Sequence, residues 1–154
     1  MENSQKYTIE EVLLSQGAYI GPTVGVSMLP LLRTGRDTVV IKAKKDRLKR
    51  LDVALYKRGD AYVLHRVLEV TEWGYIIRGD NCYSNEMIRE DAVIGVLTEF
   101  FRKGKHIYCD DEKYLRYANH RVKTYKTRRF FVLIKATFIS ILRKIFRFFF
   151  PKKK

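Results

Sequence analysis

A serine, a histidine and two carboxylates occur where they could carry out nucleophilic and acid–base chemistry. Ser27 lies in GVSMLPLL, His65 in the apolar run AYVLHRVLEV, and Asp80 and Glu86 follow the run YIIR. A serine hydroxyl becomes a nucleophile when a base takes its proton, and neutral histidine is a suitable base near pH 7. The histidine works better when a carboxylate orients it. These residue types are compatible with a Ser–His hydrolytic site, but a lone serine and a lone histidine occur in most domains, where a structural role is the more common one.

Each of these residues also has an ordinary structural interpretation. Ser27 is compatible with a turn, and His65 with a hydrogen-bonded position inside a strand. Asp80 could cap the backbone of its own turn, and Glu86 could be a surface charge. Cys82, beside Asp80, could be a redox-sensitive group or a rival nucleophile, but a small buried apolar residue is the more common role.

Segments rich in β-branched and aromatic residues dominate the middle of the chain. The turn sequences TGRD, KRGD, EWG and GDN separate them, which is typical of antiparallel strands, and KRGD and EWGY each predict a tight hairpin. The spacing of these short segments favours a mainly β domain, a partly closed barrel. The expected strands cover 37–43, 52–58, 61–70 and 75–80, followed by one or two strands within 92–108.

The order and spacing of several segments resemble the type I signal peptidase superfamily. GVSMLPLL is similar to the nucleophile box of that family, LDVALYKR to one of its strands, and RGDN to its G-D-N turn. AVIGV completes the resemblance, which covers about residues 21–104. The bacterial branch has a lysine followed by an arginine as its base, whereas the matching pair here is His65-Arg66, as in the Ser–His branch. The resemblance implies a signal-peptidase-like, partly closed or coiled β domain.

Site roles follow from the resemblance position by position. Ser27 matches the nucleophile, and His65 the general base. Gly25 matches a position that contributes to the oxyanion site in relatives with serine there, so the backbone N–H of Ser27 would take that role here. Met28 and Leu29 would form the floor of a pocket for small side chains.

The acid of this site stays open between two residues. Asp80 matches the aspartate of the G-D-N turn. The Ser–His branch usually has an Asp-Asp pair a few residues later, where this chain has Asn85-Glu86. Glu86, one methylene longer than aspartate, could stand in as the group that orients His65. The chemistry requires no metal and no organic cofactor, and two cysteines are too few for a structural zinc site.

The beginning of the chain predicts a short helix rather than an anchor. Thr8 can cap a helix over 8–17, Glu11 lies three residues later, and Gly17 can end it. The first residues show no basic start followed by an apolar run, so neither a secretory signal peptide nor an N-terminal membrane anchor is expected. The absent export signal predicts reduced thiols at Cys82 and Cys109. The expected organisation is a helical segment at 1–20, the β catalytic domain at 21–112 and a helical tail at 113–154.

Positive charge is concentrated in that tail. The chain of 154 residues carries a net charge of +14, yet residues 1–112 contain 17 basic and 17 acidic side chains. Residues 113–154 contain 14 basic residues and no acid. On a helical wheel, one face collects Phe130, Ile134, Phe138, Ile141, Ile145, Phe148 and Phe149. The opposite face collects Arg128, Arg129, Lys135, Ser140, Arg143, Lys144 and Arg147.

Three interpretations of this amphipathic helix compete. It could span a bilayer, but its longest uncharged run, 136–142, is far shorter than the roughly 20 residues that a span needs. It could dock on its own domain or on a partner protein. It could lie on an anionic membrane surface through residues 128–154, which we favour because a basic face opposes a large apolar face. Nucleic acid is a weaker expectation for a helix with this apolar face. Peripheral attachment at the cytoplasmic side of a membrane is the expected location.

The expected function is a serine endopeptidase that cleaves a leader-like or signal-like peptide after small residues. A self-cleaving repressor of the same fold is disfavoured, because such proteins use lysine and need a DNA-binding domain ahead of the serine. A non-catalytic module for peptide binding or membrane attachment is the alternative. The sequence predicts no oligomeric state.

Overall fold

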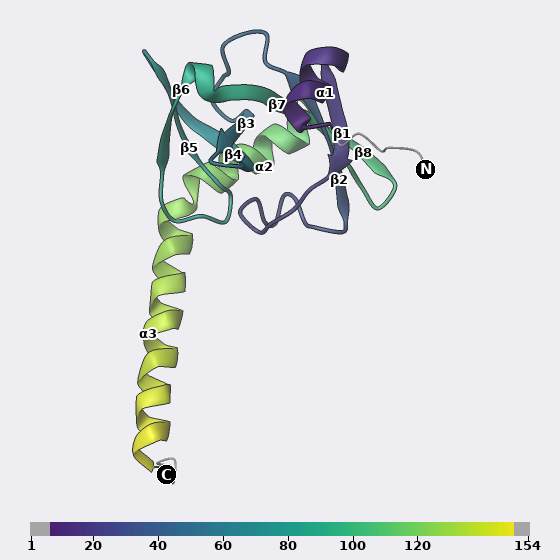
Figure 1. Cartoon of the computed structure of the whole chain (residues 1–154). Coiled ribbons are helices and arrows are strands. Elements are labelled where there is room, and N and C mark those ends of the chain that lie inside the picture. The colour runs from purple at the N-terminus through teal and green to yellow at the C-terminus, as the bar shows by residue number, and fades with distance from the viewer. Residues whose placement is uncertain (1–6, 150–154) are drawn as a thin grey trace. The chain divides into compact units, whose positions relative to one another are not determined.

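Residues 7–149 are described by the computed structural model, in which a mainly β domain is followed by two helices (Figure 1). The helices are α1 (Ile9–Gln16), α2 (Glu112–Lys123) and α3 (Tyr125–Phe149), with a short 3-10 turn η1 (Glu90–Ala92). The strands are β1 (Ala18–Pro22), β2 (Asp37–Ala43), β3 (Val53–Arg58), β4 (Ala61–Thr71), β5 (Gly74–Arg78), β6 (Glu86–Arg89), β7 (Val93–Arg102) and β8 (Lys105–Tyr108). The predicted mainly β fold class is confirmed.

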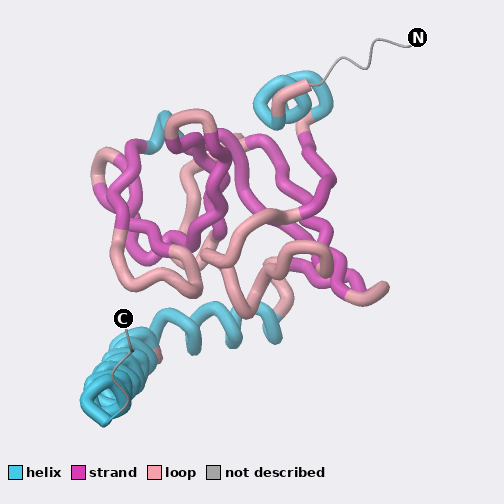
Figure 2. Tube along the Cα trace, turned by 60° about the horizontal axis from the view of Figure 1, so that its bottom comes forward, coloured by secondary structure: helices cyan, strands magenta, loops and turns pink. Residues whose placement is uncertain are grey.

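All eight strands belong to one antiparallel sheet. Their order is β1-β2-β7-β3-β4-β5-β6, and β8 pairs with β7 at the end of a hairpin. β1 and β6 end this order, so the sheet is not closed on itself. The strands coil strongly instead of lying in a flat layer (Figure 2).

The hairpin of β3 and β4 sets the register of the centre of the sheet. Arg58 pairs with Ala61 across the two-residue turn, and Ala54 pairs with His65 further along. This is the hairpin that the KRGD sequence predicts, and EWGY likewise forms the turn between β4 and β5. β3 also pairs with β7, so both of its edges are hydrogen-bonded. The strand that faces His65 is therefore held from both sides.

Two apolar clusters cover the two faces of β3. Leu55 packs with Leu13, Ile41 and Phe100 in one cluster. Ala54 and Tyr56 pack in the other cluster, with Val67, Tyr75 and Ile77. Successive residues of a strand point to opposite faces, so β3 contributes to both clusters and is buried along most of its length.

Helix α1 begins and ends where the sequence predicts. The Thr8 hydroxyl accepts a hydrogen bond from the Glu11 N–H at 3.2 Å, and the Glu11 carboxylate accepts one from the Thr8 N–H at 2.7 Å. This reciprocal pair satisfies two N–H groups that a helix start leaves unpaired. At the other end, the Gly17 N–H bonds to the Leu13 carbonyl at 2.9 Å. The expected segment 1–20 includes residues 1–6, which lie outside the described residues.

The chain divides into two compact units, residues 1–119 and 120–154. The first unit holds the sheet, α1 and most of α2, and the second holds the last residues of α2 and all of α3. No helix within residues 7–149 has the length and hydropathy of a membrane-spanning segment.

Candidate active site

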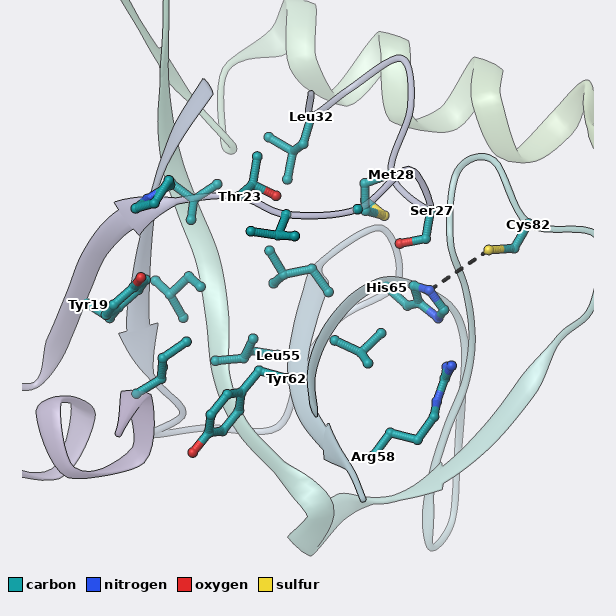
Figure 3. Close-up of a pocket in the computed structure, with 18 of the residues that line it drawn as sticks. Tyr19, Thr23, Ser27, Met28, Leu32, Leu55, Arg58, Tyr62, His65 and Cys82 are labelled. Atoms are coloured by element: carbon teal, nitrogen blue, oxygen red, sulfur yellow. Dashed lines mark hydrogen bonds between the residues drawn. The ribbon is translucent and has the colours of Figure 1, made fainter. Parts of the chain in front are cut away.

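A cavity of about 630 Å³ in the first unit brings most of the predicted site residues together. Loop 23–36 contributes Ser27, β4 contributes His65, and the start of β6 contributes Glu86. Ser27 and Cys82 lie on the same side of this cavity as the imidazole of His65 (Figure 3). Its lining includes Gly25, Ser27, Met28, Arg58, His65, Cys82 and Glu86.

His65 is the buried centre of the site. Its side chain is only 2% exposed, because β4 lies between β3 and β5 in the interior of the sheet. The two ring nitrogens have different neighbours. Nδ1 lies 3.2 Å from the Tyr56 hydroxyl and 3.3 Å from Oε1 of Glu86, whereas Nε2 lies 3.9 Å from Sγ of Cys82.

Tyr56 determines which ring nitrogen carries the hydrogen. Its hydroxyl donates to Oε2 of Glu86 at 2.8 Å, and a carboxylate can only accept. The single hydroxyl hydrogen is thereby used, so the Tyr56 oxygen acts as an acceptor toward Nδ1 of His65. Nδ1 then carries the ring hydrogen, and the lone pair lies on Nε2, which is the nitrogen nearest Cys82. A neutral histidine in this tautomer can act as a general base through Nε2.

Arg58 and Glu86 set the electrostatics around the histidine. Arg58 donates to the Tyr56 hydroxyl at 2.7 Å and also to Oε2 of Glu86. Partial burial raises the pKa of the Glu86 carboxyl, but the hydrogen bonds from Tyr56 and Arg58 outweigh burial and hold that pKa below its ordinary value. Glu86 is therefore ionised at neutral pH and faces Nδ1 of His65 as an acceptor.

The pKa of His65 is lowered from its ordinary value. Burial is the largest cause, because it disfavours the charged imidazolium, and the charge of Arg58 acts in the same direction. The negative charges of Glu86 and Asp80 oppose this shift without overcoming it. His65 is thus neutral at pH 7 and able to accept a proton.

These opposing charges predict opposite shifts when one of them is removed. In an NMR titration of the ring, Arg58→Gln should raise the pKa of His65, and Glu86→Gln should lower it further. Lys57→Gln is the matched control, because Lys57 carries the same charge one position away but pairs with Glu10. Equal shifts for Arg58→Gln and Lys57→Gln would contradict a specific role for Arg58.

Ser27 is held beside the histidine by the turn after β5. The backbone N–H of Asn81 donates to the Ser27 carbonyl at 2.7 Å, and the Asn81 side chain donates to the Val26 carbonyl at 3.2 Å. Both bonds tie loop 23–36 to the predicted G-D-N turn. Gly25 lies two residues before the serine with φ near 100°, in the left-handed region where a side chain would be strained. This backbone conformation explains the glycine at position 25.

Gly79, the first residue of the G-D-N turn, lies in the tightest part of the site. A β-carbon placed on it would be 2.6 Å from the Ser27 carbonyl oxygen, 2.7 Å from Sγ of Cys82 and 3.0 Å from Nε2 of His65. The backbone of the turn therefore contacts Ser27, Cys82 and His65 together. Only glycine allows this close approach.

Replacing Gly79 with alanine should destabilise the protein by about 1–3 kcal/mol, the usual cost of forcing an extra carbon into a packed site. Urea unfolding of Gly79→Ala measures this change. The double variant Gly79→Ala/Cys82→Ala should remain destabilised, because removal of the sulfur leaves the clash with the Ser27 carbonyl. Full recovery of stability in the double variant would show that the clash with Cys82 alone excludes a β-carbon at position 79.

Cys82 is the side chain for which a contact with Nε2 of His65 is observed. Its Sγ lies within weak hydrogen-bond distance of Nε2. Burial raises the pKa of this thiol, so at neutral pH it is protonated, and a thiolate is the reactive form of cysteine. Cys82 is therefore a thiol rather than a reactive thiolate at neutral pH, although its sulfur is close to the histidine.

Asp80 faces a different partner from the histidine. Its carboxylate accepts two hydrogen bonds from Arg66, Nε to Oδ1 and Nη2 to Oδ2, each at 2.8 Å. Tyr117 donates to the same carboxylate at 3.1 Å. Of the two candidate acids, Glu86 therefore contacts His65, whereas Asp80 binds Arg66.

The two residues predicted to form the floor of the pocket, Met28 and Leu29, lie in different places relative to the cavity. Met28 lines the cavity and belongs to the buried core. Leu29 is half-buried and, like Asp80, lies outside the cavity lining. Within residues 7–149 no group of three or more His, Cys, Asp or Glu side chains is placed to hold a metal ion.

Sequence reasoning did not identify Tyr56, Arg58 or Gly79 as site residues. The signal for two of them was available, because the predicted hairpin fixes the register of β3 against β4. Ala54, Tyr56 and Arg58 occupy every second position of β3, so their side chains lie on the same face of the strand. Ala54 pairs directly with His65. A search along that face would have found both residues.

Comparison of the chain with protein-family models gave no match, and comparison with curated proteins gave no match either.

Proposed function

We propose that this protein is a serine endopeptidase of the signal-peptidase type, with Ser27 as nucleophile and His65 as general base. The observation that carries the proposal is the arrangement around His65. Nδ1 faces an ionised Glu86, and Nε2 faces the side of the cavity that holds Ser27. The lowered pKa of His65 supports the role, since a base must be unprotonated to act.

The proposed reaction is hydrolysis of a peptide bond in two steps. Ser27 Oγ attacks the scissile carbonyl carbon while Nε2 of His65 takes the hydroxyl proton. The proton then passes from Nε2 to the leaving amine, the C–N bond breaks, and an acyl-serine ester remains. Water attacks this ester with His65 again as base, which releases the acid product and restores the serine. The carboxylate of Glu86 stabilises the imidazolium formed in each step.

The proposed substrate is a leader-like or signal-like peptide in extended conformation. A peptide strand beside the catalytic strands would be held mainly by main-chain hydrogen bonds, which tolerate many sequences. Gly25 and Met28 line the part of the cavity next to Ser27, where a small side chain would fit. Cleavage after small residues is the expected preference.

One observation favours a second candidate, a peptide-binding module without turnover. Sγ of Cys82 contacts Nε2 of His65, the nitrogen that the serine needs. A site held in this state would bind peptides and leave them intact. Cleavage therefore requires the Ser27 hydroxyl to replace the weak sulfur contact when substrate binds.

A fluorophosphonate probe tests the proposal directly, because it reacts with activated serine hydroxyls. We expect mass spectrometry to locate the label on Ser27, and His65→Gln to react far more slowly. Cys82→Ala is the control and should still be labelled. A peptide library treated with the same preparations would report the cleavage preference. Peptide binding with neither labelling nor cleavage would favour the non-catalytic module.

A further inference from the structure

Helix α3 presents a continuous apolar face that no other element of its unit covers. Phe130 is 59% exposed, Phe138 is 60% exposed, and Ile134 and Ile141 are each 49% exposed. These four residues recur at intervals of three or four along α3, so they lie on one side of the helix. The helix is 25 residues long, or about 37 Å at 1.5 Å per residue. In Figure 1 it is one unbroken helix from end to end.

The charge on the same helix has a single sign. Arg129, Lys135 and Arg143 are exposed and lie on the side of the wheel away from the apolar face. No acidic residue follows Glu112 in the sequence, so nothing within this unit neutralises them. A protein partner would have to supply both an apolar groove and many carboxylates. An anionic bilayer supplies acyl chains and negative headgroups along the whole length.

Two features favour a helix that lies on the bilayer rather than through it. Lys135 and Arg143 flank an uncharged run of only seven residues, 136–142, so both would be in hydrocarbon if the helix spanned the membrane. Described residues 7–149 also contain no helix of suitable length and hydropathy. Lying in the interface instead leaves the basic side chains at headgroup level while Phe130 and Phe138 enter the acyl region.

We propose that α3 binds the surface of anionic lipid bilayers, with Phe130, Ile134, Phe138 and Ile141 inserted and the basic face toward the headgroups. Negatively charged lipids of this kind are typical of cytoplasmic leaflets. The proposal rests on the second unit alone and is independent of the chemistry at Ser27. The expected surface extends to residues 150–154, which lie outside the described residues, as do the side chains of Lys144, Ile145 and Arg147–Phe149.

Sedimentation of the full-length protein with lipid vesicles tests the proposal. Binding to mixed phosphatidylcholine–phosphatidylserine vesicles should exceed binding to pure phosphatidylcholine at least about tenfold. Phe138→Asp should weaken binding to the mixed vesicles at least about tenfold more than Ser140→Asp, because Phe138 is on the apolar face and Ser140 is not. The two variants introduce the same charge two residues apart, so they are matched. Circular dichroism of each variant confirms that the helix is retained.

Three results would overturn the proposal. The first is equal binding to neutral and anionic vesicles, and the second is equal loss in Phe138→Asp and Ser140→Asp. The third is tighter binding to a single-stranded oligonucleotide than to the mixed vesicles, weakened equally by Phe138→Asp and Ser140→Asp. That outcome would identify a nucleic-acid surface that uses the basic residues alone.

Discussion

Replacing Ser27 with alanine should lower kcat/KM for peptide cleavage by about 10⁴-fold or more while the protein stays folded. The hydroxyl oxygen forms the covalent bond to the substrate in the proposed reaction, and a methyl group cannot replace it. Ser27 is half-buried on a loop, so the same change should cost no more than about 1 kcal/mol of stability. Single-turnover cleavage and urea unfolding measure the two effects separately.

Cys82→Ala is the matched control for this experiment. Sγ of Cys82 contacts Nε2 of His65, and Ser27 lines the same cavity, so each change removes one small polar atom near the histidine. Activity should be retained, because the raised pKa of Cys82 keeps the thiol protonated at neutral pH. Loss of cleavage in Cys82→Ala with activity kept in Ser27→Ala would identify a cysteine peptidase instead.

Asp80→Asn should give the largest loss of stability, about 3–5 kcal/mol in the free energy of unfolding. The substitution keeps the shape of the side chain but removes its charge. Arg66 is completely buried, and it also donates to the Leu51 carbonyl and the Tyr114 hydroxyl. Asp80, however, supplies the carboxylate that balances its charge. A buried guanidinium without a counter-charge is strongly unfavourable. Urea unfolding at neutral pH measures the change.

Two further variants show whether the loss of stability in Asp80→Asn comes from the buried ion pair. Asp91→Asn removes a carboxylate from an ion pair in which both side chains are largely exposed, so it should give no measurable change. The double variant Arg66→Met/Asp80→Leu replaces the buried pair with apolar groups and should recover most of the lost stability. A stable Asp80→Asn protein that has lost activity would instead make Asp80 an acid of the catalytic site.

Local sequence patterns predicted the elements better than their pairing. Elements that depend only on neighbouring residues were predicted correctly. They are the hairpins at KRGD and EWGY, the strand at 37–43 and the capped helix. The order β2-β7-β3 depends on contacts between distant segments, which no local pattern encodes. β1 and β6 were not expected, because the first contains Gly21 and Pro22 and the second is a short charged edge strand.

The candidate site was predictable in its residue types and only partly in its geometry. Ser27 and His65 were found from chemistry and from the resemblance to a family, and both line the same cavity. The choice between Asp80 and Glu86 depended on where Arg66 and Tyr56 point, and side-chain direction across a coiled sheet is a tertiary property. The sequence predicted Gly79 as part of a turn. Its close approach to Ser27 was not predictable, because it depends on packing between two segments about fifty residues apart.

The attachment of loop 23–36 to the turn at 79–82 bears on the order in which the protein folds. The hairpin of β3 and β4 brings Tyr56, Arg58 and His65 together within ten residues, and such local pairs form early because they close only a short loop. The Asn81 side chain bonds to the Val26 carbonyl of loop 23–36 across 55 positions of sequence, next to Ser27. That closure has a larger entropic cost, so we expect it to occur late in folding. In the proposed peptidase, hydrolytic activity would therefore appear only once the whole domain has assembled, so incomplete chains would not cut their neighbours.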